Sequence, residues 1–223
     1  MENKKFAIQE TLLVVVLLTF VSGFVDGNTF AFDGGRFAGL QTGNVIQGGI
    51  ALAKGQFPHA LTFAVPFVGF ILGVMVNTLV KRRFKNHPRI IFEEVALAIQ
   101  IAGLSATTLF SVFLNQTIEI GLLSFFMAMQ VDSFGKLRGG TVATVFTTGN
   151  TKTFASNLMT GISTKDVTAL KTAGRYLLVI GGFFVGAFAS TWLMRFTHNY
   201  TLLVAPVVLL VVWLLIHFNK EAA

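Results

Sequence analysis

The chain contains six apolar runs, four of them long enough to cross a membrane as helices. About 20 apolar residues are needed to span the hydrocarbon core of a bilayer. The runs cover residues 11–32, 60–80, 90–113, 118–134, 175–194 and 202–218. Apolar residues make up 53% of the chain and charged residues 12%, so a water-soluble fold would have too little polar surface to cover these runs. The sequence therefore predicts an all-α integral membrane protein.

One pattern occurs twice, an aspartate followed sixteen residues later by Thr-Gly-Asn. The first copy is Asp26 with Thr42, Gly43 and Asn44, and the second is Asp132 with Thr148, Gly149 and Asn150. When the chain is shifted by 106 residues without gaps, nine of the 36 positions from 20 to 55 are identical. Such a repeat decides architecture. It predicts a single membrane domain over residues 1–223, with one repeat at about 8–113 and the other at about 118–219.

Lysine and arginine residues predict the topology. The two Thr-Gly-Asn segments, residues 38–53 and 142–159, are more polar than the long runs. If both cross the membrane, seven basic residues lie on one side and nine on the other, with Lys152 between them. If both dip in and return, fourteen lie on one side and only Arg36, Lys54 and Arg195 on the other. Positive residues collect on the cytoplasmic side, so the second arrangement is favoured.

The predicted fold is thus six transmembrane helices plus two half-membrane re-entrant segments, around residues 42–53 and 148–159, with both termini cytoplasmic. Each half has three crossings, which is an odd number, so the second half is inserted upside down. An inverted internal repeat with broken helices at the midplane is common among transporters. Re-entrant turns are tolerated there only when they line a cavity or are buried in protein.

Among the ten acids of the chain, only Asp26 and Asp132 lie within or at the end of an apolar run beside a repeated turn. A carboxylate inside the membrane is costly and by default indicates an ion or proton pathway. The structural alternative is that each acid caps a half-helix or pairs with a nearby basic residue. For Asp132 the nearby basic residues are Lys136 and Arg138.

In each Thr-Gly-Asn, threonine can cap a helix, glycine permits a tight turn, and asparagine offers a donor and an acceptor. The N–H groups at such a helix start favour an anion or a polar solute, but the turn could also serve only to pack the two repeats together. Lys152 binds an anion, pairs with an acid, or extends to the cytoplasmic membrane surface. The candidate substrate or ion pathway residues are Asp26, Thr42, Gly43, Asn44, Gln130, Asp132, Thr148, Gly149, Asn150 and Lys152.

Two pairs of glycines have the spacing that lets membrane helices approach closely. They are Gly69 with Gly73 and Gly182 with Gly186. These faces are expected to form the interface between the two halves or between subunits of a homo-oligomer.

No enzymatic signature emerges from the sequence. The four histidines lack metal-ligand spacing, and no nucleophile motif is present. We therefore expect no catalysis, cofactor or metal. The net charge of +7 comes partly from residues 81–89, which directly follow an apolar run. Such a run anchors a protein to anionic lipid, so the expected partners are the lipid bilayer and a small solute, with no nucleic acid.

Several motifs together resemble the YoaK-type family, a group of uncharacterised bacterial integral membrane proteins defined by a domain of unknown function. They are Ser-Gly-Phe-Val-Asp at 22–26, both Thr-Gly-Asn sequences, and Met129-Gln130 followed by Phe134, Lys136 and Gly139. The resemblance implies a protein of the bacterial inner (plasma) membrane and supplies no substrate. Members often have an amide or another polar residue where this chain has Asp132, which makes Asp26 the stronger candidate.

The leading functional hypothesis is a small secondary transporter or channel for a polar or ionic solute, with proton coupling through Asp26. The alternative is a non-transporting membrane scaffold or accessory protein. A transporter requires both Thr-Gly-Asn turns beside a shared polar cavity that at least one acid faces. In a scaffold, the turns would be dry and fully hydrogen-bonded.

Overall fold

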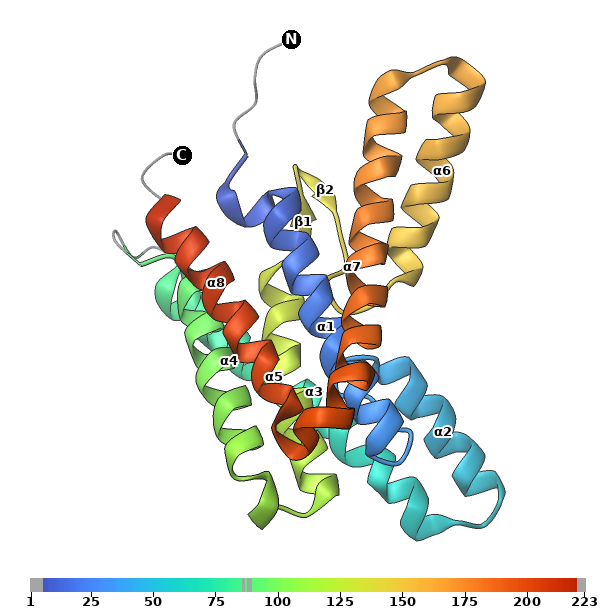
Figure 1. The fold of residues 1–223 in the computed structure, drawn as a ribbon, viewed down its shortest axis with the longest axis vertical. Helices are drawn as coiled ribbons and strands as arrows, with labels where there is room; N and C mark the ends of the chain where they lie inside the picture. The colour runs from blue at the N-terminus through green and yellow to red at the C-terminus, as the bar shows by residue number, and fades with distance from the viewer. Residues whose placement is uncertain (1–5, 86, 88–89, 220–223) are drawn as a thin grey trace.

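The computed structural model of the chain describes residues 6–85, 87 and 90–219. Lys4, Lys5, Arg89 and Lys220, which contribute to the predicted topology, lie outside the described residues. The helices, shown in Figure 1, are α1 (Leu12–Phe32), α2 (Gln41–Ala53), α3 (Phe57–Phe84), α4 (Phe92–Leu109), α5 (Gln116–Ser133), α6 (Thr148–Thr164), α7 (Val167–Thr197) and α8 (Val204–Asn219). Short 3-10 turns are η1 (Ile8–Glu10), η2 (Ser111–Phe113) and η3 (His198–Leu203), and a hairpin pairs β1 (Lys136–Leu137) with β2 (Gly140–Thr141).

Each of the six apolar runs forms a helix, as the sequence predicts. Among the described residues, four helical stretches are long and apolar enough to cross a membrane, namely α1, α3, α7 and Tyr200–Asn219. Helices α4 and α5 have 18 residues each. Large apolar side chains such as Leu61, Phe184 and Phe188 are more than 60% exposed. Exposed apolar surface of this extent is typical of a face that contacts lipid, and the chain is accordingly a helical membrane protein.

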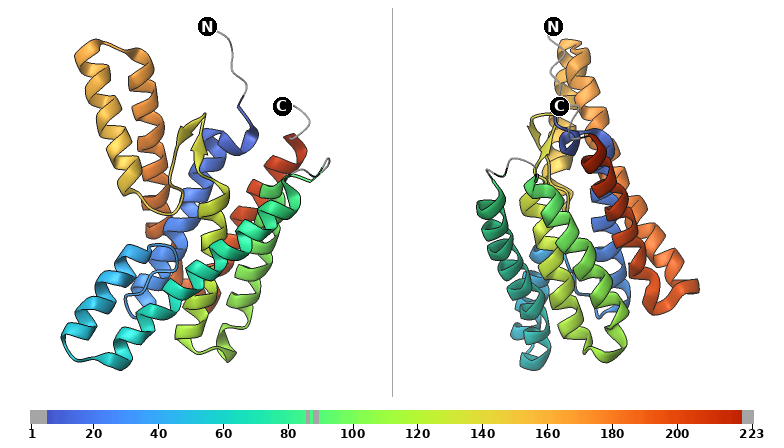
Figure 2. Two further views of the ribbon diagram at one scale, coloured as in Figure 1. Left: turned by 180° about the vertical axis from the view of Figure 1, so that it is seen from behind. Right: turned by 90° about the vertical axis from the view of Figure 1, so that its left-hand side faces the viewer.

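The helices pack in matching pairs (Figures 1 and 2). Helix α1 lies along α7, and α3 lies along α5, while α2 folds back on α3 and α6 folds back on α7. Helix α4 contacts both α5 and α8. The start of α1 and the end of α8 lie at the same end of the molecule (Figure 1).

Both glycine pairs lie where two helix backbones touch. A methyl group added at Gly73 would come within 2.1 Å of the Phe125 carbonyl oxygen, and one added at Gly186 within 2.1 Å of the Phe20 carbonyl oxygen. Gly69 faces the backbone of Gly121, and Gly182 faces α1 in the same way. The sequence predicts that these glycines lie between the two halves of the chain or between subunits. In the structure they lie between the two halves of one chain.

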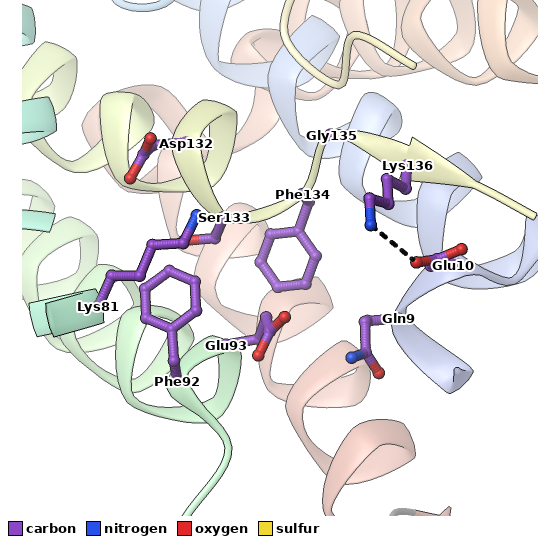
Figure 3. A pocket seen from close by; sticks show the side chains of 10 residues that line it. All are labelled: Gln9, Glu10, Lys81, Phe92, Glu93, Asp132, Ser133, Phe134, Gly135 and Lys136. Carbon is purple, nitrogen blue, oxygen red and sulfur yellow. Dashed lines mark ion pairs between the residues drawn. The ribbon is translucent and has the colours of Figure 1, made fainter. Parts of the chain in front are cut away.

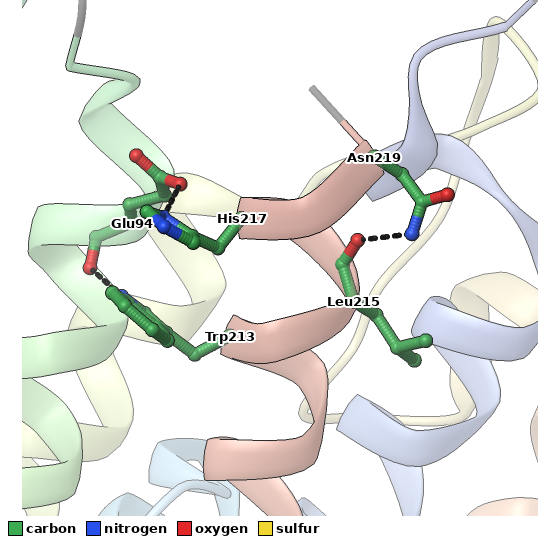
Figure 4. Close-up of polar contacts among 5 residues, drawn as sticks. All are labelled: Glu94, Trp213, Leu215, His217 and Asn219. Atoms are coloured by element: carbon green, nitrogen blue, oxygen red, sulfur yellow. Dashed lines mark hydrogen bonds and ion pairs between the residues drawn. The ribbon is translucent and has the colours of Figure 1, made fainter. Parts of the chain in front are cut away.

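A polar clasp joins α4 to α8 near the end of α8 (Figure 4). Trp213 Nε1 donates to the Glu94 carbonyl oxygen at 3.1 Å, and His217 Nδ1 lies 3.0 Å from Glu94 Oε1. The rings of Trp213 and His217 stack with centroids 4.7 Å apart. Because α4 lies in the N-terminal half of the chain and α8 in the C-terminal half, this clasp ties the two halves together.

The two short helices differ in length. Helix α2 has 13 residues and begins at Gln41, close to the expected 42–53 segment. Helix α6 has 17 residues and continues to Thr164, beyond the expected end at residue 159. At 1.5 Å per residue, α6 is roughly 25 Å long. The longer α6–α7 hairpin extends past the neighbouring helix ends (Figure 1).

Candidate functional site

The Asp26 carboxyl group lies where the loops that precede the two short helices meet. Asp26 is 2% exposed, and its Oδ1 accepts a hydrogen bond of 2.6 Å from the Gly39 backbone N–H. Gly39 precedes α2, and the Val145 side chain lies against it, since a methyl group added at Gly39 would be 2.3 Å from Val145 Cγ1. Val145 precedes α6 and is fully buried. Asp26 therefore lies at the contact between the two repeats.

The second oxygen of this carboxyl group is buried without a partner. Asp26 Oδ2 makes no hydrogen bond to any residue that the structure describes. The same is true of the Thr144 hydroxyl group, beside Val145 in the chain. A buried polar atom without a partner costs about 1–3 kcal/mol. Such a group calls for an explanation, and a role in binding a proton or a solute is one.

Asn44 and Asn150 make the same hydrogen-bond pair in their two turns. Asn44 Oδ1 accepts from the Phe37 N–H at 2.9 Å, and its Nδ2 donates to the Phe37 carbonyl oxygen at 2.8 Å. Asn150 bonds Ala143 in the same way, at 3.0 and 2.7 Å. Both asparagines are buried. Each one closes the loop before its helix.

A polar chain extends from the first turn into the second repeat. Gln41 Oε1 accepts from Asn44 Nδ2, and Gln41 Nε2 donates to Ser124 Oγ, both at 2.9 Å. Ser124 in turn donates to the Pro66 carbonyl oxygen at 2.7 Å. These bonds fix the start of α2 against α5 and α3.

Arg36 ties the 33–40 loop to the start of α5. Its guanidinium group donates to Thr117 Oγ1 at 2.7 Å and to Gln116 Oε1 at 2.8 Å. Burial lowers the pKa of Arg36, and the nearby Asp33 charge opposes that shift. Burial also raises the pKa of Asp33, against the effects of a hydrogen bond from Gln116 and of the Arg36 charge.

Gln130 lies in a second buried network, between α1, α4 and α5. Its Nε2 donates to Ser22 Oγ at 2.8 Å and to the Leu18 carbonyl oxygen at 3.0 Å. Its Oε1 accepts from Gln100 Nε2 at 3.3 Å. Because these contacts join three helices, Gln130 has a packing role whatever else it does.

Asp132 has different surroundings from Asp26. Its Oδ2 accepts a 2.8 Å hydrogen bond from Asn77 Nδ2 of α3. It lines a pocket of about 390 Å³ with residues of η1, α3, α4 and the segment that leads to β1 (Figure 3). Lys136, one of the two basic residues considered as its partner, instead lies 3.9 Å from Glu10.

The other candidate residues lie at the surface. Thr42, Thr148, Gly149 and Lys152 are exposed. Gly43 is half-buried against the Phe37 ring, which a methyl group at residue 43 would approach to 2.5 Å. The structure thus brings Asp26 and Asn44 to the same loop and keeps Asp132 and Lys152 apart from them.

The sequence patterns did not single out several residues that surround Asp26, Gln130 and Asp132. Gly39 and Val145 carry no motif, and only their contact identifies them. Asn77 and Gln100 could have been found, since each is an amide inside an apolar run and polar residues there are rarely without a role. Within residues 6–85, 87 and 90–219, no three His, Asp or Glu side chains gather as metal ligands.

Comparison with known proteins supplies a family and no activity. A family model described as "Protein of unknown function (DUF1275)" matches residues 14–215. No curated protein and no solved structure matches the chain. Since the match covers nearly all of the six apolar runs and both repeated turns, the chain belongs to the DUF1275 family of proteins of unknown function.

Proposed function

We propose that this protein is a small secondary transporter or channel for a polar or ionic solute in a bacterial cell membrane, coupled to protons through Asp26. The observation that carries the proposal is the Asp26 carboxyl group, which is buried between the repeats with one oxygen unpartnered among the described residues. A carboxyl group inside an apolar membrane segment by default indicates a proton or ion pathway.

The proposed architecture has six crossings, two re-entrant helices (α2 and α6) and both termini in the cytoplasm. It is supported by the matched packing of α1 on α7 and of α3 on α5, because exchanging the repeats turns one pair into the other. It is also supported by the contact of Gly39 with Val145. These residues are 106 positions apart, so they are repeat counterparts, and counterparts that touch lie near a two-fold axis.

A second candidate function is a non-transporting scaffold or accessory protein. The specific observation for it is that Asn44 and Asn150 are both buried and bonded to backbone groups. This is the state expected of turns that only hold the halves together. In the transport proposal, the same bonds hold the two loops together while no solute is bound.

The substitution Asp26→Asn separates the two candidates. The amide keeps the size of the side chain and the acceptor for the Gly39 N–H. Purified protein is first screened for solutes that raise its melting temperature, because ligands that bind the native state stabilise it. The best solute is then tested in vesicles with an imposed pH gradient. Transport predicts that Asp26→Asn melts like the wild type and loses pH-driven flux.

A scaffold role predicts a different result, in which Asp26→Asn lowers the melting temperature and any flux falls only with the yield of folded protein. Asp132→Asn is the matched control, since Asp132 already has Asn77 as a partner. Full pH-driven flux through a well-folded Asp26→Asn variant would rule out the coupling role.

The orientation has its own test, because the chain has no cysteine. A single Lys85→Cys variant places a thiol at the end of α3. In intact cells, an impermeant maleimide should label this thiol only after the membrane is opened, while Lys54→Cys in the α2–α3 turn should be labelled directly. Labelling of position 85 from outside would reverse the proposed orientation.

A further inference from the structure

A pocket of about 330 Å³ lies between the α6–α7 hairpin and the β1–β2 hairpin. Arg138 of the β-turn and Arg175 of α7 both line it. Around them are the side chains of Thr153, Asn157 and Thr172, together with Thr141. Acidic side chains are absent from this lining, so its net charge is positive.

The two arginines have no anionic partner in the part of the chain that the structure describes. Because both arginines line the same pocket, two like charges lie near each other there. The hydroxyl groups of Thr153 and Thr172 donate to carbonyl oxygens of their own helices, and Asn157 Nδ2 donates one of its two N–H groups in the same way. These bonds leave the guanidinium N–H groups and the second N–H of Asn157 free to bind an anion.

The positions of the first repeat that correspond to the two arginines carry no positive charge. Shifted by 106 residues, Arg138 and Asn157 correspond to Phe32 and Ala51. Shifted by 113, which aligns the two glycine pairs, Arg175 corresponds to Thr62. The charges are specific to the second hairpin.

We propose that this pocket binds an oxyanion of the phosphate type, held between the guanidinium groups of Arg138 and Arg175. The planar guanidinium group matches the oxygens of phosphate and forms paired hydrogen bonds with them. An anion between two like charges also replaces their repulsion with attraction. On the proposed cytoplasmic side, the phosphate group comes either from an anionic lipid or from a free anion.

The first experiment measures thermal unfolding of the full-length protein in neutral detergent, with inorganic phosphate against chloride at equal ionic strength. Phosphate should raise the melting temperature in a saturable way. Arg138→Gln and Arg175→Gln should each weaken phosphate binding at least about tenfold, because each removes a charge-assisted contact. Lys171→Gln, an exposed charge on α7 outside the pocket, should respond like the wild type.

The repulsion gives a second readout that a purely structural role would not produce. Without phosphate, Arg175→Gln should melt at or above the wild-type temperature, because one of two repelling charges is gone. If Arg175 only supports the fold, this variant melts lower and keeps its response to phosphate. That result would overturn the proposal, and so would an equal response of all four proteins to phosphate.

The source of the phosphate group is tested in vesicles of pure phosphatidylcholine and of phosphatidylcholine with one-fifth phosphatidylglycerol. A lipid ligand predicts that phosphatidylglycerol stabilises the wild type, that Arg175→Gln loses this effect, and that added phosphate then does nothing more. A free anion predicts that phosphate stabilises the wild type equally in both vesicles. If neither phosphatidylglycerol nor phosphate has an effect that depends on Arg175, the pocket has a different role.

Discussion

In both repeats, an asparagine near the start of a short helix bonds the backbone seven residues earlier, Asn44 to Phe37 and Asn150 to Ala143. The aspartates sixteen residues before the two turns are held differently. Asp26 is buried against the Gly39 N–H with one oxygen unpartnered among the described residues. Asp132 is half-buried, bonds Asn77 and lines a pocket at the end of α5.

The asparagine bonds, which both repeats share, serve the fold, whereas the surroundings of the aspartates differ between the repeats. The asparagine bonds are the same because the loop before each short helix is largely buried and must satisfy its backbone groups. The acids differ in their contacts. Asp26 accepts from the Gly39 N–H, and a methyl group at residue 39 would lie 3.1 Å from Asp26 Oδ2, whereas the residue that corresponds to Gly39 in the second repeat is Val145. Because glycine has no side chain, the backbone N–H of residue 39 can approach Asp26. The Val145 side chain occupies the space where a side chain of residue 39 would lie.

The largest expected effect concerns the packing that the two repeats share. Gly73→Ala and Gly186→Ala should each lower the free energy of unfolding by about 3 kcal/mol or more, because the new methyl group meets a backbone carbonyl group that cannot move aside. Gly181→Ala is the control on α7, as its Cβ would meet nothing within 4 Å. Denaturation of the detergent-solubilised protein measures each change. If only one of the two variants is destabilised, the helix pairs are not equivalent.

The next prediction concerns the contact between repeat counterparts. Gly39→Val should cost about 2–3 kcal/mol of unfolding free energy, because its side chain overlaps Val145 and crowds Asp26. Combining it with Val145→Gly should recover at least about 1 kcal/mol, since the second change vacates the space. Melting curves of the two single variants and the double variant complete the cycle. Strict additivity of the two changes would mean that these residues do not touch.

A smaller effect is expected at the asparagines that the repeats hold alike. Asn44→Ala and Asn150→Ala should each cost about 1–2 kcal/mol, because a buried N–H and a buried carbonyl group lose their partner. The Asn44 variant should be the worse one, because the additional bond of Asn44 to Gln41, at 2.9 Å, is shorter than that of Asn150 to the Phe146 carbonyl oxygen, at 3.4 Å. Asn219→Ala, which removes an exposed bond of the same type, should change stability little. Equal melting of all three variants would contradict the assigned role of the turns.

The smallest effect is expected at the second acid. Asp132→Asn should change the free energy of unfolding by less than about 0.5 kcal/mol, because the amide oxygen still accepts from Asn77 and the side chain is only half-buried, at the edge of a pocket. The measurement is the same melting assay, run beside Asp26→Asn. A loss larger than about 2 kcal/mol would show that the fold depends on the charge of Asp132, which would contradict this prediction.

Much of the fold could be predicted from the sequence because hydropathy is a local property. The runs at 11–32 and 60–80 correspond to α1 and α3 within a few residues. The end of α6 could not be placed as well, because the sequence after residue 159 has no apolar face to mark it. The glycine pairs were found by their spacing, but their partners were not, since spacing does not say which helix lies opposite.

The sequence by itself determined that the chain is helical, that it lies in a membrane and that it repeats. Each of these follows from composition and spacing along the chain. Only the tertiary structure decided that Asp26 meets Gly39, that Asp132 meets Asn77, and that Arg138 and Arg175 share a pocket. The physical reason is that hydrogen bonds and charges act over a few ångströms in space, and packing brings together residues that the sequence keeps far apart.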